Sequence, residues 1–307
     1  MRNFLNGFLM GAAEILPAIN GSIVALLLGV YEKRIEQIAV IMNSFKKILS
    51  DLRKGKITKL SEIIKGWDIT FIGAATVGLV IGTIALTFVV MGIFENTPHY
   101  ALAFIMGLVV AVIPIPIHYI DKKYVLYLFT AVFAVLSWYL LGMQNVDISQ
   151  PSPIYLAFAG FTALSGMIVP GLSGSFILLV LGVYYSVISN IKDIITFNFD
   201  LQIIINITAF SLGSISGLAI SSKLIKHLMD NHIAVFMSVI LGLVIGSFRE
   251  VYPFVINTAQ DGLELEKVAI NSFDSKQLVF MAILFLIPAV SLGYSNIKKI
   301  RSGEFNV

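Results

Sequence analysis

The chain has 307 residues, of which 57% are hydrophobic and only 13% are charged, and its formal net charge is +3. Soluble domains carry about 25% charged residues, so this composition and the mean hydropathy of +0.90 exclude a water-soluble globular protein. Because the chain has no cysteine and only four scattered histidines, thiol chemistry and metal-ligand spacings are also excluded. We expect one polytopic all-α membrane domain over residues 1–307 that binds no metal, cofactor or nucleic acid.

The first apolar stretch, residues 4–31, is long for one straight helix and too short for two spans joined by a turn. Pro17 lacks an N–H and Gly21 is free to adopt a positive φ, so we expect the helix to break there and to restart with Asn20 or Ser22 as its cap. Such a break inside a bilayer is tolerated only when it is buried in protein or lines a wet cavity. A re-entrant helical hairpin fits this stretch, and a kinked spanning helix is the alternative.

A polar, basic stretch follows at residues 32–68. Its apolar residues recur at helical spacings of 3, 4, 3 and 4, at Ile38, Ile41, Phe45, Ile48 and Leu52. The pattern predicts a basic amphipathic helix lying on the anionic lipids of the inner leaflet. An ordinary basic cytoplasmic loop is the alternative.

Six further apolar runs are each close to the ~20 residues that a helix needs to cross the hydrocarbon of a bilayer. They predict six ordinary transmembrane helices, at roughly 70–94, 100–120, 124–142, 202–225, 233–249 and 277–294. Gly78, Gly82, Gly213 and Gly217 lie within these runs, and we interpret them as helix-packing positions.

A duplication divides the chain into two halves. Residues 17–31 (PAINGSIVALLLGVY) recur as residues 170–184 (PGLSGSFILLVLGVY), with eight identical positions. The second helix break is accordingly expected at Pro170 and Gly171. Duplicated apolar segments broken by Pro and Gly indicate the substrate site of a transporter. We assign repeat one to residues 1–143 and repeat two to residues 151–297, each a re-entrant hairpin followed by three transmembrane helices.

The distribution of basic residues predicts the orientation of the two repeats. With both termini in the cytoplasm and each hairpin returning to its own side, seventeen of the 21 Lys and Arg residues lie inside. Three spans separate the hairpins, so the second would enter the bilayer from the opposite face. The repeats are therefore expected to be inverted.

Helix N-termini at the two breaks would face each other near the middle of the bilayer and attract an anion. Free N–H groups from Asn20 to Ile23 and from Ser173 to Phe176, together with the serine hydroxyls, are expected to hold a phosphate or carboxylate. The candidate binding residues are Asn20, Gly21, Ser22, Ser173, Gly174 and Ser175. Arg249, near the outer end of its span, would snorkel or meet an anionic headgroup.

Glu14 is the acidic residue that this interpretation places within the membrane, three positions before Pro17. An ionisable group at such depth is costly and is a functional candidate by default. We expect it to accept a proton or bind a coupling cation, H⁺ or Na⁺. The alternative is that its carboxylate caps backbone N–H groups of the hairpin.

Residues 11–22 (GAAEILPAINGS) and 167–175 (MIVPGLSGS) resemble the two signature stretches of the bacterial polyprenyl-phosphate transporter family, formerly an uncharacterised membrane domain family. The resemblance covers nearly the whole chain and implies a flippase for undecaprenyl phosphate in the plasma membrane, which recycles the lipid carrier of peptidoglycan synthesis. Ala18 and Asn20 depart from it, since Gly and Ser are expected there, and Glu14 stands where Asp is common.

The chain also resembles, more distantly, the undecaprenyl-diphosphate phosphatases. It keeps the Glu, Leu and Pro of their first stretch, at Glu14, Leu16 and Pro17. Asn20, Ile23 and Gly174, however, stand where that family has Ser, His and Arg. Phosphoryl transfer needs such charge stabilisation and a nucleophile or base, so the resemblance implies binding without catalysis. A phosphatase is thus disfavoured, and a transporter of a small soluble anion stays open as the other alternative.

Overall fold

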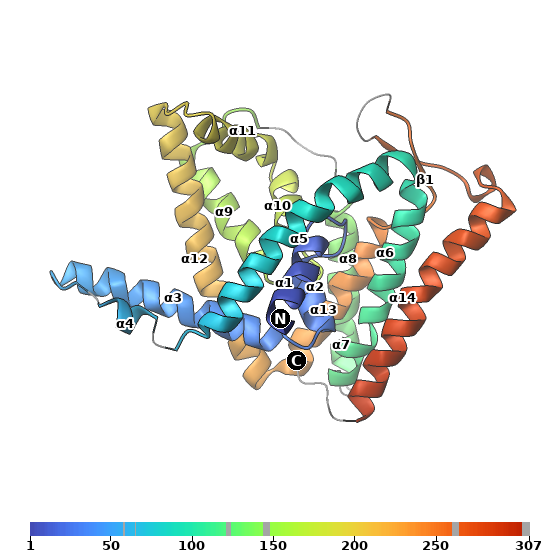
Figure 1. Ribbon diagram of the computed structural model, residues 1–307, viewed down its shortest axis with the longest axis horizontal. Helices are drawn as coiled ribbons and strands as arrows, with labels where there is room; N and C mark the ends of the chain where they lie inside the picture. The colour runs from blue at the N-terminus through green and yellow to red at the C-terminus, as the bar shows by residue number, and fades with distance from the viewer. Residues whose placement is uncertain (58, 65, 121–123, 144–147, 260–263, 303–307) are drawn as a thin grey trace.

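The computed structural model describes residues 1–57, 59–64, 66–120, 124–143, 148–259 and 264–302, which are mostly helical (Figure 1). Residues 58 and 65 of the predicted insertion lie outside these ranges. Among the described residues, four helical segments are long and apolar enough to cross a membrane: α5 (Ile69–Asn96), α6 with α7 (Pro98–Val112 and Pro114–Tyr119), α12 (Leu201–Asn231) and α14 (Ser275–Arg301).

These four segments confirm four of the six predicted spans. The other two runs form shorter apolar helices, α8 (Tyr124–Leu140) and α13 (Ile233–Gly246), the latter continued by a 3₁₀ turn at Ser247–Arg249. Their 17 and 14 residues fall below the ~20 of a full perpendicular crossing. Both are nevertheless apolar along their whole length, and several α8 side chains are largely exposed.

Both copies of the duplicated motif break as predicted. In the first copy α1 (Arg2–Ala13) ends before the motif and α2 (Gly21–Leu27) folds back against it. In the second copy α9 (Pro153–Met167) and α10 (Gly174–Val180) do the same. Neither proline lies within a continuous rod. The predicted breaks are therefore present, and the return of each hairpin to its own side of the bilayer stays a prediction.

The backbone at the first break differs from the expectation in one respect. Gly21 does not take the left-handed conformation; Ala18 does, with φ 59°, and its counterpart in the second break is Gly171, with φ 91°. An L-residue with a side chain is strained in this region, whereas glycine is not. Gly21 is needed for a different reason, because a Cβ there would lie 2.6 Å from a carboxylate oxygen of Glu14.

The two halves of the chain pack in the same pattern and are interlocked. Helix α1 lies along α5, and α9 lies along α12, while α6 packs against α14 and α13 against α8. In each half a long helix, α5 or α12, therefore packs along the first helix of the hairpin of the same half. The pairs α6–α14 and α8–α13 join the two halves. The predicted packing role of four glycines is confirmed, since a Cβ at any of them would collide with a backbone carbonyl of the facing helix: Gly78, Gly82, Gly213 and Gly217.

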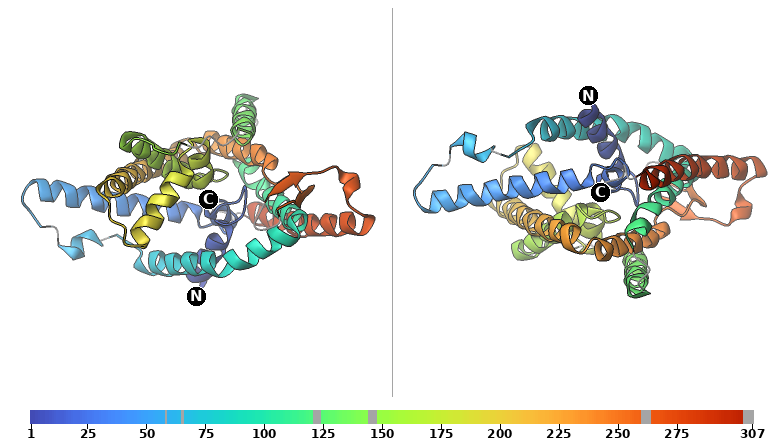
Figure 2. Two further views of the ribbon diagram at one scale, coloured as in Figure 1. Left: turned by 90° about the horizontal axis from the view of Figure 1, so that it is seen from above. Right: turned by 90° about the horizontal axis from the view of Figure 1, so that it is seen from below.

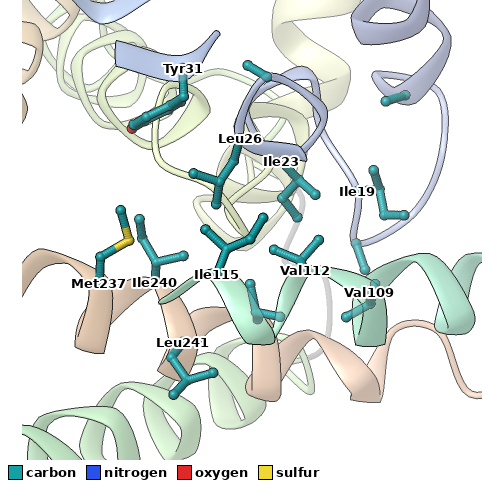
Figure 3. Close-up of a cluster of buried hydrophobic side chains, with 14 of the residues drawn as sticks. Ile19, Ile23, Leu26, Tyr31, Val109, Val112, Ile115, Met237, Ile240 and Leu241 are labelled. Carbon is teal, nitrogen blue, oxygen red and sulfur yellow. The ribbon is translucent and has the colours of Figure 1, made fainter. Parts of the chain in front are cut away.

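The core lies between the first hairpin and the helices of both halves. Side chains of α2, α6, α7 and α13 interdigitate there, among them Ile23, Leu26, Ile115 and Ile240, all with 0% exposure (Figure 3). The ring of Tyr31 lies in this cluster and stacks on Phe236, 6.3 Å away. Helix α2 of the first hairpin is consequently anchored in the core by buried apolar contacts.

Two helices begin immediately after the hairpins. Helix α3 (Tyr31–Arg53) packs at its start against α12, and its outer part extends beyond the other helices, next to the short α4 (Leu60–Ile63) (Figures 1 and 2). Helix α11 (Tyr184–Ile195) leaves α10 at an angle of 116°. The predicted insertion is therefore helical over residues 31–53.

A small antiparallel pair of strands, β1 (Val255–Asn257) and β2 (Leu265–Lys267), and a 3₁₀ turn at Ile270–Ser272 lie between α13 and α14. Strand β1 contacts α5 and α6, and Leu265 of β2 reaches the cavity described below. This segment therefore covers one end of the helix bundle.

Candidate functional site

The breaks of the two hairpins meet, and Asn20 makes the contact. Its Nδ2 donates to the carbonyl of Leu172 at 2.6 Å and to those of Val169 and Met167 at 3.3 and 3.5 Å. Its Oδ1 accepts the N–H of Ile23 at 3.0 Å, which confirms the predicted cap of α2. The side chain is 3% exposed, so every polar atom of this amide is used within the protein.

Two further side chains of the first copy bind the second break. The hydroxyl of Ser22 donates to the carbonyl of Met167 at 2.9 Å, and that of Tyr31 donates to the carbonyl of Ile168 at 2.9 Å. Both residues have 0% exposure. We call these bonds, with those of Asn20, the latch. The latch gives side-chain donors to the carbonyls of Met167, Ile168, Val169 and Leu172 at the second break.

A cationic side chain, that of Arg34, contacts the latch. The guanidinium of Arg34, on α3, donates to the hydroxyl of Ser22 at 3.1 Å and acts electrostatically on Glu14 and Tyr31. Arg34 belongs to the basic stretch at residues 32–68, and its contact with the hairpin was not predicted from the sequence. The signal for it was its position, one helical turn after Tyr31, which keeps it on the face of α3 that contacts the hairpin.

Glu14 turns back onto the hairpin. Its Oε1 accepts the N–H of Gly21 at 3.0 Å. The expectation that the N–H groups from Asn20 to Ile23 are free is therefore wrong for two of them, because Glu14 takes that of Gly21 and Asn20 takes that of Ile23. The physical reason is that a dry helix start must find acceptors within the protein.

A cavity of about 310 Å³ separates the first break from α10. It is lined by Glu14 and Pro17 from the first break, by Ser173 and Ser175 from the second, and by Glu250. The remaining lining is apolar and includes the last turns of α5 and Leu265: Ile15, Leu16, Ala18, Val90, Met91, Phe94, Phe176, Leu179 and Leu265. The structure thus brings together four of the predicted polar or break residues around one polar-and-apolar cavity.

The second break offers free polar groups to this cavity. Ser173 and Ser175 hydrogen-bond each other at 2.8 Å and Ser175 is exposed. Ser173 precedes α10 without a side-chain bond to its N–H groups, in contrast to Asn20. A headgroup in the cavity would therefore meet two hydroxyls and the start of α10.

The other predicted binding residues lie elsewhere. Ser22 is buried in the latch, and Gly21 and Gly174 pack against α1 and α9 rather than lining the cavity. Arg249 donates to the carbonyl of Trp138 at 3.0 Å, with its guanidinium 5.5 Å from that ring, and packs on Gly142. In this conformation its side chain is held against the end of α8.

Glu250 is the acidic residue that the sequence analysis missed. Its carboxylate accepts the backbone N–H of Ala18, so both carboxylates of the cavity bind the first break. The predicted span ended at Arg249, which placed its neighbour in an outer loop. A charged pair at the end of an apolar run was the available signal.

Carboxylates and hydroxyls are the polar side-chain groups that line the cavity. Within the described residues no group of three His, Asp or Glu side chains is placed to hold a metal ion. The charged residues among those lining the cavity in this part of the chain are the two carboxylates. An anion would therefore enter next to carboxylates that need a proton or a cation.

The chain is similar in sequence to two proteins that are named polyprenyl-phosphate transporters. The chain is 23% identical to a polyprenyl-phosphate transporter of Vibrio cholerae over 304 residues, which cover 95% of this chain and 94% of the relative. It is 28% identical to a polyprenyl-phosphate transporter of Staphylococcus aureus over 276 residues, covering 82% and 86%. No solved structure gives a significant match.

The model of one protein family matches residues 10–264, a segment that includes both breaks, the latch and every residue lining the cavity except Leu265. Its description names undecaprenyl phosphate translocase-like proteins. With its membrane-length apolar helices, the chain is a multi-pass membrane protein that belongs to this VCA0040-like, undecaprenyl phosphate translocase-like family.

Proposed function

We propose that the protein moves polyprenyl phosphate, specifically undecaprenyl phosphate, across the bacterial plasma membrane and so recycles the lipid carrier of cell-wall synthesis. The observation that carries the proposal is the cavity between the two duplicated breaks, in a chain of this family. The phosphate would bind there against Ser173 and Ser175. Two inverted repeats, each with a re-entrant hairpin and both termini in the cytoplasm, would give such a site access to either side.

The apolar surroundings support a lipid substrate over a small soluble anion. Met91 on the cavity wall is 52% exposed, which gives a prenyl chain a way out toward the bilayer beside α5. A second, almost entirely apolar cavity of about 420 Å³ is lined by Tyr252, which is close to Glu250 in the sequence, and by side chains of α6 and α14. A small soluble anion would need neither feature.

Glu14 and Glu250 support coupling to a cation. A phosphate beside two carboxylates in a poorly solvated cavity is repelled strongly unless the carboxylates are neutralised. We infer that H⁺ or Na⁺ binds at Glu14 together with the substrate. Arg249 adds to the binding in this scheme when its guanidinium leaves the Trp138 carbonyl and turns toward the headgroup.

The basic face of α3 fits the anionic inner leaflet. Lys46, Lys47 and Arg53 are exposed on its outer part, together with Phe45 at 46% and Leu52 at 58%. A basic helix with apolar side chains between its charges binds such a surface. This contact would orient the protein without taking part in transport.

Native mass spectrometry of the detergent-purified protein tests the substrate. We expect a polyprenyl monophosphate to co-purify, and its amount to fall in the variant Ser173→Ala/Ser175→Ala. The matched control is Ser302→Ala, an exposed serine at the end of α14. Retention of ordinary phospholipids alone would favour the small-anion transporter, and release of phosphate from a polyprenyl pyrophosphate would favour the phosphatase.

Reconstituted vesicles test translocation itself. A short-chain polyprenyl phosphate placed in one leaflet should appear in the other at a rate that depends on protein. We expect Glu14→Gln to remove the dependence of this rate on an imposed H⁺ or Na⁺ gradient. A rate that is equal with and without protein would refute the proposed transport.

A further inference from the structure

The duplicated motif is used in two different ways in this conformation. Positions in the copies differ by 153, so Asn20, Ser22 and Tyr31 correspond to Ser173, Ser175 and Tyr184. The first three are buried and form the latch with the carbonyls of Met167, Ile168, Val169 and Leu172. Among the described residues, their counterparts form no hydrogen bond to the first break.

The carbonyls that would complete the opposite arrangement lie across the cavity. By the same offset, the acceptors Met167 and Ile168 correspond to Glu14 and Ile15. Both of these line the cavity, and so does Ser175 on the other wall. The cavity therefore occupies the place where a second, equivalent latch would form.

We propose that Tyr184 and Ser175 are gate residues, whose hydroxyls bind the carbonyls of Ile15 and Glu14 in a second conformation where this cavity is closed. The present latch would open in that conformation and create the equivalent cavity on the other side. This inference rests on the inverted repeats and the transport proposed above. Exchanging the conformations of two inverted repeats converts one access state of a transporter into the other.

The two latches are unequal, which sets the resting state. The present latch has the amide of Asn20 and the guanidinium of Arg34 on Ser22, whereas the corresponding residues are Ser173 and Val187. The second latch thus has fewer donors and no buried cation. The conformation described above is accordingly the more populated one in the absence of substrate.

Thiol labelling measures this equilibrium directly, because the natural chain has no cysteine. Leu179 lines the present cavity, and its counterpart Leu26 has 0% exposure. In vesicles, Leu179→Cys should react rapidly with a membrane-impermeant maleimide. Leu26→Cys should react slowly, and only from the opposite side of the membrane.

Removal of each gate hydroxyl should shift the labelling in opposite directions. Tyr184→Phe removes a bond of the second conformation alone, and we expect it to slow the labelling of Leu26→Cys about fivefold, the effect of one net hydrogen bond. Tyr31→Phe should accelerate that labelling by about the same factor. Tyr185→Phe, at the neighbouring exposed tyrosine, is the matched control and should change nothing.

Tyr184→Phe should leave thermal stability unchanged, because no hydrogen bond of the Tyr184 hydroxyl contributes to the latch or cavity walls described here. Unchanged labelling of Leu26→Cys in this variant overturns the gate. So does a transporting protein in which Leu26→Cys is never labelled. Co-purification of polyprenyl monophosphate in either case keeps the proposed function intact, so the two proposals fail separately.

Discussion

The first and second breaks of this protein share a sequence pattern and differ in how their polar groups are satisfied. In the first, Glu14, Asn20 and Glu250 take the backbone N–H groups. In the second, Ser173 and Ser175 bind each other and face a cavity. A few side chains therefore decide whether a broken helix has its N–H groups bonded within the protein or leaves polar groups for a ligand.

Among the substitutions that test this difference, Asn20→Ala has the largest expected effect on the unfolding free energy. Asn20→Ala removes the helix cap and the short hydrogen bond to the carbonyl of Leu172 at the second break, so we expect a loss of about 3 kcal/mol in unfolding free energy. Ser173→Ala, the equivalent change, should cost less than about 0.5 kcal/mol. Unfolding in mixed micelles measures both. Equal losses for the two variants would contradict the asymmetry.

Replacing Arg34 tests how much its charge contributes to the first break. Arg34→Gln leaves Glu14 without its cationic neighbour and weakens the bond to Ser22, and we expect a loss of about 2 kcal/mol. The double variant Glu14→Gln/Arg34→Gln should recover more than half of it, since no uncompensated charge remains. Strict additivity in this double-mutant cycle would show that the two side chains do not interact.

The backbone at the two breaks gives a smaller and opposite pair of effects. Ala18→Gly relieves a left-handed alanine and should stabilise the protein by about 0.5 kcal/mol, after the entropy that glycine adds to the unfolded state. Gly171→Ala should destabilise it by about 1 kcal/mol, because the added Cβ is strained and lies 3.1 Å from the Cβ of Leu243. Melting temperatures of the two variants check the signs.

The smallest expected effect lies outside both breaks, at the start of α5. The pKa of Asp68 is lowered by two contacts of its carboxylate. The ammonium of Lys33 lies 2.6 Å from one oxygen, and the N–H of Phe71 donates to the other. A lowered pKa stabilises the fold at pH values above the ordinary carboxyl pKa of about 4, and that stabilisation disappears as the pH falls through the lowered pKa. Asp68→Asn should flatten this part of the pH profile of the melting temperature, and Glu36→Gln, also exposed, should not.

Local sequence patterns were enough to predict the membrane environment, the two helix breaks and the correspondence between the two copies of the motif. Apolar runs of about 20 residues require a bilayer, and Pro17 and Pro170 with their glycines cannot continue a helix. Glycines at helix interfaces follow from the same local reasoning. The cap at Asn20 also followed, because its residue type and place before an apolar run suffice to predict it.

The contacts between polar groups that lie far apart in the chain could not be predicted and follow from the three-dimensional packing. Glu250 reaches the cavity from a segment far along the chain, and Arg34 reaches the hairpin from α3. No local sequence pattern predicts these contacts. The same holds for Asn20, whose amide binds carbonyls about 150 positions away. Local propensity acts over a few residues, whereas the closing of one break and the opening of the other depend on how the two halves pack together.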